Sequence, residues 1–309
     1  MGILNNIMNL VACGGSAVLG TGTKGCVPYL KKTKDLWIIT RGFIFDGTRT
    51  LDKTYTDELQ ASGKLIVVNG IRTFTDNSGE DQIETLEDGT EQVTTLGLYK
   101  FLVQFTNGLY FHAALNSLSS FGQYDVLFVD TAGNILGTEA PSGSLKGFSV
   151  GRIQGQKLIF ATDTAAQKEG LVFQLTERAE LDESYVYIQK QAGFDPRVLE
   201  GVNQVVLTYV NEPVGTDTIL TIKAVSQQSG APIGGIPHTD FLVKKNSVVS
   251  NPMSGGDSAI AGTYVLTILP LEQSDIVDSS LYNNISNSVG ISLDGSLYKS
   301  NTISATVAS

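Results

Sequence analysis

The sequence predicts a mainly β protein: an antiparallel β-sandwich or barrel with one flanking α-helix, followed by a C-terminal immunoglobulin-like β-sandwich. Three observations favour this fold class. Short apolar runs recur along the chain, with turn-forming residues between them. Glycine occurs 33 times in 309 residues, which suits tight turns between strands. A single segment shows the apolar spacing of an amphipathic helix.

Ten short apolar runs predict the strands of a first domain over residues 35–200. These runs are residues 36–40, 42–45, 64–69, 71–75, 97–106, 124–130, 135–137, 158–161, 171–176 and 185–189. Gly70 separates two of the runs and indicates a bend or bulge. Because turns follow the runs closely, we expect neighbouring strands to pair antiparallel.

Residues 107–121 predict the helix of this domain. Its apolar positions, which have the spacing of one helix face, are Phe111, Ala114, Leu115, Leu118 and Phe121. Asn107 is expected to cap the start of the helix, and Gly122 to end it. The apolar stripe should therefore pack against a sheet.

Two further regions flank this domain. Residues 1–34 are rich in glycine and have no clear period, so they are interpreted as an extended arm. Residues 201–309 contain five strand-like runs separated by turns, which fits an immunoglobulin-like sandwich. This part has neither Cys nor Trp, so the antibody Cys–Trp–Cys signature is missing and the assignment depends on the strand pattern.

The charge of the chain argues against a nucleic-acid reader. The net charge is −10 and the pI about 4.7. Such a surface repels DNA and anionic lipid unless a basic patch is set apart. Lys31, Lys32 and Lys34 form the densest basic stretch and are interpreted as a solvated loop. No run of 18 apolar residues occurs, so no membrane span is predicted.

Residues 80–91 (EDQIETLEDGTE) form the most acidic stretch of the chain. Six of its positions are acidic and none is basic: Glu80, Asp81, Glu84, Glu87, Asp88 and Glu91. The ligand spacing of a calcium-binding EF-hand loop is absent. A solvated, protruding hairpin or loop is therefore the better interpretation.

Residues suited to catalysis or metal binding are few. The chain has two cysteines, Cys13 and Cys26, and two histidines, His112 and His238, without the spacing of a zinc site. We interpret both cysteines as reduced thiols by default, although a disulfide is possible. His112 lies on the predicted helix and is read as packed or surface, and His238 lies in a turn-rich loop and is read as exposed.

Two further sequence features bear on catalysis and cofactor binding. Gly20, Gly22 and Gly25 match G-x-G-x-x-G, but no βαβ unit surrounds them, so a dinucleotide site is not expected. The carboxylates that could serve a glycosidase lack neighbouring aromatic platforms for a sugar; they are Glu84, Glu87, Asp88 and Glu91. We therefore expect no enzyme and no cofactor.

The order of these elements resembles the major tail tube proteins of tailed bacteriophages. The resemblance is carried by residues 94–137, TTLGLYKFLVQFTNGLYFHAALNSLSSFGQYDVLFVDTAGNILG, in which a strong strand, one helix and another strand follow the acidic stretch. It covers the architecture of the whole chain and includes no diagnostic motif. Some members of that family carry a C-terminal immunoglobulin-like domain.

The resemblance implies a structural virion protein of the tail, assembled in the host cytoplasm. Its partners would be further copies of itself in stacked rings, other virion proteins, and DNA that passes through the lumen without specific binding. The arm and the acidic stretch would reach an adjacent ring, and the C-terminal domain would decorate the outside. The net charge of −10 fits an acidic lumen.

Other functions stay open from the sequence. A capsid decoration protein or head–tail connector would share the acidic charge and the sandwich. A bacterial surface adhesin is a different class, favoured by Leu10-Val11-Ala12-Cys13, which is similar to a lipoprotein cleavage box but has no Lys or Arg before it. A β-rich glycosidase or peptidase comes last, since its candidate residues are few.

Overall fold

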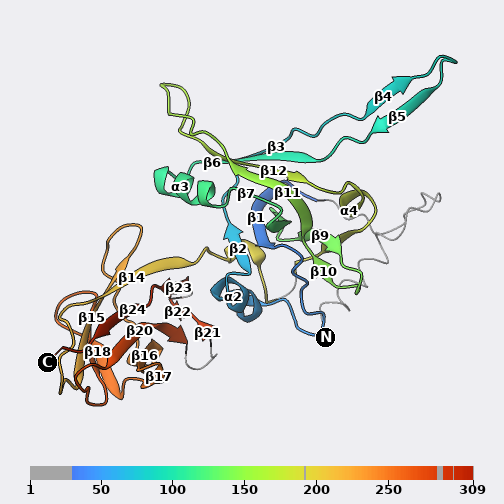
Figure 1. Cartoon of the computed structure of the whole chain (residues 1–309). Helices are drawn as coiled ribbons and strands as arrows, with labels where there is room; N and C mark the ends of the chain where they lie inside the picture. Colours follow the sequence, from blue (N-terminus) through green and yellow to red (C-terminus); the bar gives the residue numbers. More distant parts are fainter. Residues whose placement is uncertain (1–29, 191–192, 284–287, 295, 309) are drawn as a thin grey trace. The chain divides into compact units, whose positions relative to one another are not determined.

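The computed structural model describes residues 30–190, 193–283, 288–294 and 296–308. The chain divides into two compact units (Figure 1). Among the described residues, the first unit contains residues 30–56 together with those between Gly63 and Leu199, and the second contains Asp57–Ser62 together with those from Glu200 onward. Strands make up 46% of the described residues and helices 10%, which confirms the mainly β fold class.

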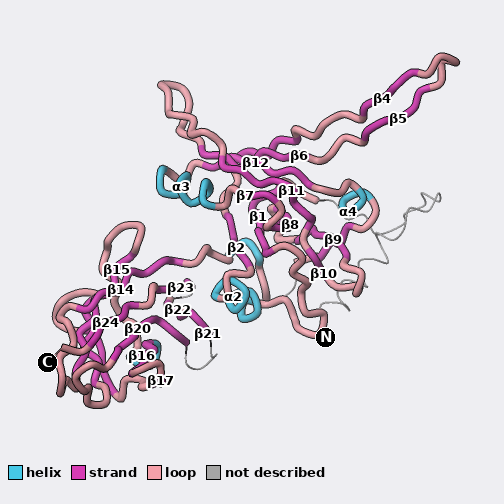
Figure 2. The backbone as a smooth tube through the Cα atoms, viewed as in Figure 1, coloured by secondary structure: helices cyan, strands magenta, loops and turns pink. Residues whose placement is uncertain are grey.

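One sheet with eleven strands forms the framework of the first unit (Figure 2). The strands are β1 (Thr33–Thr40), β2 (Leu65–Val68), β3 (Thr73–Asp76), β6 (Lys100–Phe105), β7 (Ser120–Phe121), β8 (Tyr124–Asp130), β9 (Ile135–Glu139), β10 (Leu145–Lys146), β11 (Phe148–Gly155), β12 (Glu169–Leu175) and β13 (Tyr185–Ile188). All the pairings in this sheet are antiparallel, as the short connections predict.

The sheet wraps around its core because β8 shares one edge between two partners. One edge of β8 pairs with β1 alone, from Thr33 to Thr40 of β1. On the shared edge, β9 pairs with the end of β8, and β11 pairs with its beginning. β11 then continues past β8 to pair with β12, which pairs with β6 and through it with β3. Two layers thus enclose one apolar interior.

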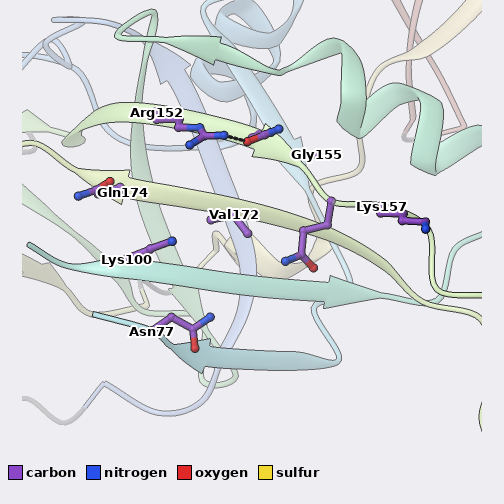
Figure 3. A pocket seen from close by; sticks show the side chains of 9 residues that line it. Asn77, Lys100, Arg152, Gly155, Lys157, Val172 and Gln174 are labelled. Carbon is purple, nitrogen blue, oxygen red and sulfur yellow. Dashed lines mark hydrogen bonds between the residues drawn. The ribbon is translucent and has the colours of Figure 1, made fainter. Parts of the chain in front are cut away.

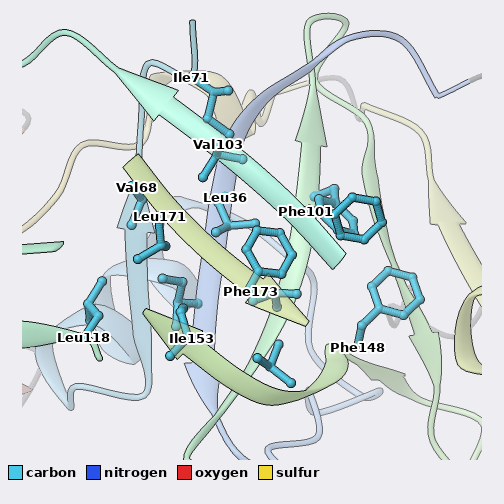
Figure 4. Packing of buried hydrophobic residues seen from close by; sticks show 14 of the residues in the cluster. Leu36, Val68, Ile71, Phe101, Val103, Leu118, Phe148, Ile153, Leu171 and Phe173 are labelled. Atoms are coloured by element: carbon cyan, nitrogen blue, oxygen red, sulfur yellow. The ribbon is translucent and has the colours of Figure 1, made fainter. Parts of the chain in front are cut away.

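Aromatic rings fill much of this interior (Figure 4). Phe128 on β8 is 3% exposed, and its ring centroid lies 5.6 Å from that of Phe101 and 5.7 Å from that of Phe148. Phe173 on β12 and Phe74 on β3 contact the same ring, at 6.0 and 5.9 Å. Since these residues come from five strands, the ring of Phe128 joins both layers of the unit.

β6 and β12 have one buried face and one open face. In β6, Phe101, Val103 and Phe105 point into the core, and the residues between them face solvent to differing degrees. In β12, Leu171 and Phe173 are fully buried in the same way. This alternation is the period of a half-buried strand, and it leaves the outer face of β3, β6, β12 and β11 uncovered by the core.

The first unit contains more helix than the sequence predicts. α3 (Leu109–Ser117) corresponds to the expected helix, and α4 (Ala179–Asp182) is a single turn. α2 (Lys53–Ala61) was not predicted, and the boundary between the two units passes through it after Thr56. Asp52 accepts a hydrogen bond from the backbone N–H of Tyr55 at 2.8 Å, which is the N-cap signal that marks the start of α2.

The predicted bounds of α3 were wrong at both ends. The N-cap residue is Gly108, with φ of 98°, and no side chain caps the helix. The helix ends at Ser117. Leu115 and Leu118 are buried, whereas Phe121 lies in β7 and is 77% exposed. Pairing of Ser120–Phe121 with β11 replaces the last predicted helical turn, because strand hydrogen bonds satisfy the same backbone groups.

A carboxylate on β12 holds the entry to α3, in place of the predicted cap Asn107. Glu169 is 1% exposed, and it accepts hydrogen bonds from the backbone N–H groups of Asn107 at 3.0 Å and Gly108 at 3.1 Å. The side-chain amide of Gln167 donates a third at 2.7 Å. The buried carboxyl group therefore has hydrogen-bond donors from two segments.

Glu169→Ala should lower the free energy of unfolding by about 3 kcal/mol, because it leaves two backbone donors without their acceptor. Glu169→Gln retains one acceptor oxygen and should lose roughly half as much. Urea unfolding of both variants measures the difference. Equal stability of the alanine variant and the natural chain would contradict this role for Glu169.

Two sheets form the second unit. The first contains β14 (Asn203–Tyr209), β15 (Ile219–Ser226), β18 (Ser254–Asp257), β19 (Thr263–Thr267), β22 (Ile291–Leu293) and β23 (Ser296–Ser300). The second contains β16 (Phe241–Lys245), β17 (Val248–Val249), β20 (Ile276–Asn283), β21 (Ser288–Val289) and β24 (Ile303–Thr306). Short 3₁₀ turns lie at Pro196–Val198, which belongs to the first unit, and at His238–Asp240.

The strand order of the second unit is that of an immunoglobulin-like sandwich. One sheet runs β14-β15-β19-β18, and the other runs β17-β16-β20-β24. These orders correspond to ABED and C′CFG of the immunoglobulin fold. The hairpin β22–β23 is an addition between β20 and β24, and β23 pairs parallel with β14. The predicted C-terminal fold is therefore confirmed by topology, without the Cys–Trp–Cys signature.

A single core joins the two sheets of this sandwich. Tyr264 on β19 packs on Phe241 of β16, with ring centroids 5.1 Å apart. The Tyr264 hydroxyl donates to the carbonyl of Ile233 at 2.7 Å, so its buried polar atom is satisfied. Burial raises the pKa of this tyrosine to about 12.

Candidate assembly surface

The acidic stretch forms a hairpin that projects from the first unit. β4 (Gln82–Thr85) and β5 (Glu91–Thr95) pair only with each other among the described strands. Every residue of both strands is exposed. Figure 1 shows the hairpin running away from the sheet, as an extension of β3 and β6. An isolated two-stranded ribbon is only marginally stable in water. Because no other described strand pairs with this one, it would gain stability from a surface that covered it.

A hydrogen-bonded network fixes the base of the hairpin. Asp81 accepts from the guanidinium of Arg178 at 2.9 Å and from the backbone N–H of Gly97 at 2.8 Å. Arg178 also pairs with Asp182 at 2.7 Å, and Asp182 accepts the hydroxyl of Tyr99 at 2.5 Å. The sequence groups Asp81 with the acidic residues expected to reach an adjacent ring, but in this structure it binds within its own chain.

The network also sets the ionisation of its carboxyl groups. The hydrogen bond from Gly97 and the Arg178 contact lower the pKa of Asp81. The hydroxyl of Tyr99 and the contact with Arg178 lower the pKa of Asp182. Because both folded-state pKa values lie below the unfolded ones, their contribution to stability is present above about pH 4 and is lost as the pH falls through the folded values.

The two arms of the hairpin approach closely at Gly79 and Gly97. A Cβ atom on Gly97 would lie 2.0 Å from the carbonyl oxygen of Gly79, which no real contact allows. A Cβ atom on Gly79 would have no neighbour within 4 Å. The close approach therefore requires glycine at position 97 and not at position 79.

Gly97→Ala should open the base of the hairpin and lower the free energy of unfolding by about 1–3 kcal/mol, the range found for overpacking. Gly79→Ala is the matched control and should change stability by less than about 0.5 kcal/mol. Thermal unfolding, together with limited proteolysis of the hairpin, measures both effects. Equal behaviour of the two variants would show that the close approach is not needed.

The tip of the hairpin is built by Asp88. Its carboxylate accepts from the backbone N–H of Thr90 at 3.0 Å and from the hydroxyl of Thr90 at 2.6 Å. Gly89 adopts a φ of 81°, which closes the turn. The hydrogen bonds from Thr90 lower the pKa of Asp88. Of the six acidic residues, Asp81 and Asp88 thus shape the hairpin itself.

The other four carboxylates are exposed and contact no side-chain partner within the described residues. They are Glu80, Glu84, Glu87 and Glu91. Apolar side chains lie among them: Ile83 pairs across the ribbon with Val93, and both are about half exposed, at 57% and 48%. The hairpin therefore presents negative charge and uncovered apolar surface together.

A shallow groove with basic side chains crosses the outer face of the eleven-stranded sheet, over β6, β12 and β11 (Figure 3). Its volume is about 320 Å³. Its charged lining side chains are Lys100, Arg152 and Lys157, and its amide side chains are Asn77, Gln154, Gln156 and Gln174. No carboxylate lines it in the part of the chain that the structure describes. We call this feature the basic groove.

Strand register brings the lysine and arginine of the basic groove together. Lys100 on β6 lies opposite Gln174 on β12, which lies opposite Arg152 on β11. Arg152 stacks over the ring of Phe121 at 5.7 Å, and its guanidinium donates to Gln154. Sequence reasoning missed this site, because Lys100 and Arg152 lie far apart in the chain and only the register makes them neighbours.

The remaining candidates from the sequence do not form a site in the described residues. His112 contacts the side-chain amide of Asn116 at 3.0 Å, and His238 begins a 3₁₀ turn. Among the described residues, no group of three or more His, Cys, Asp or Glu side chains could hold a metal ion. The same residues contain no helix long and apolar enough to cross a membrane.

Residues 1–29 of the predicted arm, and the motifs in them, lie outside the described residues. This applies to Cys13, to Cys26, to the Leu10–Cys13 box and to the glycine motif at positions 20–25. Lys32, in the basic stretch that follows, donates to the backbone carbonyl of Arg72 at 3.0 Å. Lys34 belongs to β1, so this stretch is partly a strand and not wholly the predicted loop.

Comparison with known proteins gives little guidance. No protein-family model and no curated protein matches the chain. A solved chain from the crystal structure of mouse coronavirus receptor-binding domain complexed with its murine receptor matches with a TM-score of 0.21 and 13% identity. That match covers 76% of this chain and 100% of the other. Function is therefore inferred from this chain's own residues.

Proposed function

We propose that this chain is a structural virion protein whose copies polymerise into stacked rings, forming a phage tail tube through which DNA passes. The observation that carries the proposal is the hairpin β4–β5, which is fixed at its base and exposed on both faces. Such a ribbon gains stability when a neighbouring molecule covers it. The element order of the first unit supports the same assignment.

The proposed assembly joins unlike surfaces of identical chains. A hairpin on one copy and a receiving surface on the next make a heterologous contact, which produces closed rings or open filaments and not a twofold dimer. Other virion proteins would attach at the two ends of the tube. The net charge of −10 disfavours tight binding of DNA, so DNA would pass without specific contacts.

Sedimentation of the purified chain over a range of concentrations tests the polymeric state. The proposal predicts growth from monomer to species of indefinite size above a critical concentration. A capsid decoration protein would stop at a small closed oligomer, and a connector would stop at one ring. A species that remains monomeric at every concentration would contradict the proposal and favour a surface adhesin.

A further inference from the structure

We propose that the basic groove of one copy receives the acidic hairpin of the next copy. This inference rests on the proposed self-assembly and assigns the two surfaces that make the contact. It concerns Glu87 and Glu91 on the hairpin, and Lys100, Arg152 and Lys157 in the groove.

Charge is the first argument for this pairing. Residues 80–99 contain six carboxylates and no basic residue. The groove has the opposite character, with three cationic side chains and no carboxylate among its described lining residues. Neither Lys100 nor Lys157 forms an ion pair within the described residues, so their charges are available to a partner. Opposite surfaces of this kind orient an encounter and penalise wrong partners.

Apolar surface is the second argument, and it favours the hairpin over nucleic acid. Ile83 and Val93 form a cross-strand pair on one face of the hairpin, and Glu91 lies on that same face because side chains alternate along a strand. The groove offers half-buried Val172 in its floor, and Phe121 is exposed beside Arg152. A nucleic-acid backbone would use the cations but leave the Ile83–Val93 pair uncovered.

The geometry requires two molecules. Asn77 and Lys100 stand where β3 and β6 leave the sheet to become the hairpin, so the groove begins at the root of the hairpin. Figure 1 shows the ribbon leading away from that root, and the Asp81–Arg178 contact holds its base. The hairpin therefore cannot fold back into its own groove. The contact repeats from copy to copy, as a polymer needs.

Charge reversal tests the pairing. The hairpin variant carries Glu87→Lys and Glu91→Lys, and the groove variant carries Lys100→Glu and Lys157→Glu. Each should raise the critical concentration for polymerisation by tenfold or more, because like charges then face each other. The control variant carries Lys223→Glu and Lys244→Glu on the second unit, which matches the charge change of the groove variant and should polymerise normally.

Mixing the hairpin variant with the groove variant tests whether the two surfaces contact each other. In an equal mixture, the lysines introduced at positions 87 and 91 of one variant meet the carboxylates introduced at positions 100 and 157 of the other, and the natural hairpin meets the natural groove. Neither variant should polymerise alone at the concentration where their mixture does, and this rescue excludes misfolding as the cause. Each variant should also retain the Trp37 fluorescence and circular dichroism of the natural chain.

The outcomes separate this inference from the proposed function. If the natural chain polymerises and the reversals have no effect, or mixing gives no rescue, the pairing is wrong while the tube proposal stands. If the groove variant polymerises normally but loses binding to a fluorescent single-stranded DNA, the groove serves a polyanion and the pairing is wrong. If the natural chain never polymerises, both proposals fail.

Discussion

Removal of the hairpin should abolish polymerisation and leave the fold intact. Gly79 and Gly97 adjoin at its base, and the backbone N–H of Gly79 donates to the carbonyl of Leu98 at 3.3 Å. Residues 80–96 can therefore be replaced by Asn-Gly, the sequence favoured in a two-residue hairpin turn. The register of β3 with β6 does not include the deleted residues.

The shortened chain should sediment as a monomer at concentrations where the natural chain forms large species. Its far-ultraviolet circular dichroism should lose only the small contribution of the removed ribbon. Loss of the Asp81–Arg178 contact should cost little stability, since both groups are substantially exposed. A shortened chain that still forms long polymers would show that the hairpin is not the assembly element.

Phe128→Ala should produce the largest loss of stability, about 3–5 kcal/mol in the free energy of unfolding. The ring is 3% exposed and contacts aromatic rings from four other strands, so its removal leaves a cavity between both layers. Phe128→Leu keeps more of the volume and should lose less than half as much.

Trp37 provides a local measurement of this effect. It is the single tryptophan of the chain, it lies on β1 in the first unit, and it is fully buried. Its fluorescence in a urea titration therefore reports unfolding of the first unit. A midpoint for Phe128→Ala equal to that of the natural chain would contradict the central place of the Phe128 ring in the core.

Much of the strand framework follows from local pattern. Residues 97–106 and 124–130 predict β6 and β8 because alternating or continuous apolar runs correspond to half-buried and fully buried strands. The C-terminal sandwich is predicted from strand spacing alone. α2 is missed because its charged and polar residues hide the short apolar face formed by Tyr55 and Leu59.

Errors arise where distant segments decide local structure. Asn107 is a good cap by sequence, yet Glu169 from another strand satisfies the donors at that helix entry. Asp81 resembles its acidic neighbours in sequence, and only the folded position of Arg178 distinguishes it. The hairpin half of the candidate contact is thus visible as a run of carboxylates, whereas the groove half depends on strand register.

Electron microscopy of the purified, polymerised chain tests the central claim most directly. The account predicts hollow tubes of uniform bore, built from stacked rings, in which the ribbon of residues 80–96 lies against a neighbouring copy. Closed trimers, isolated single rings or dispersed monomers under conditions where the chain is folded would contradict it.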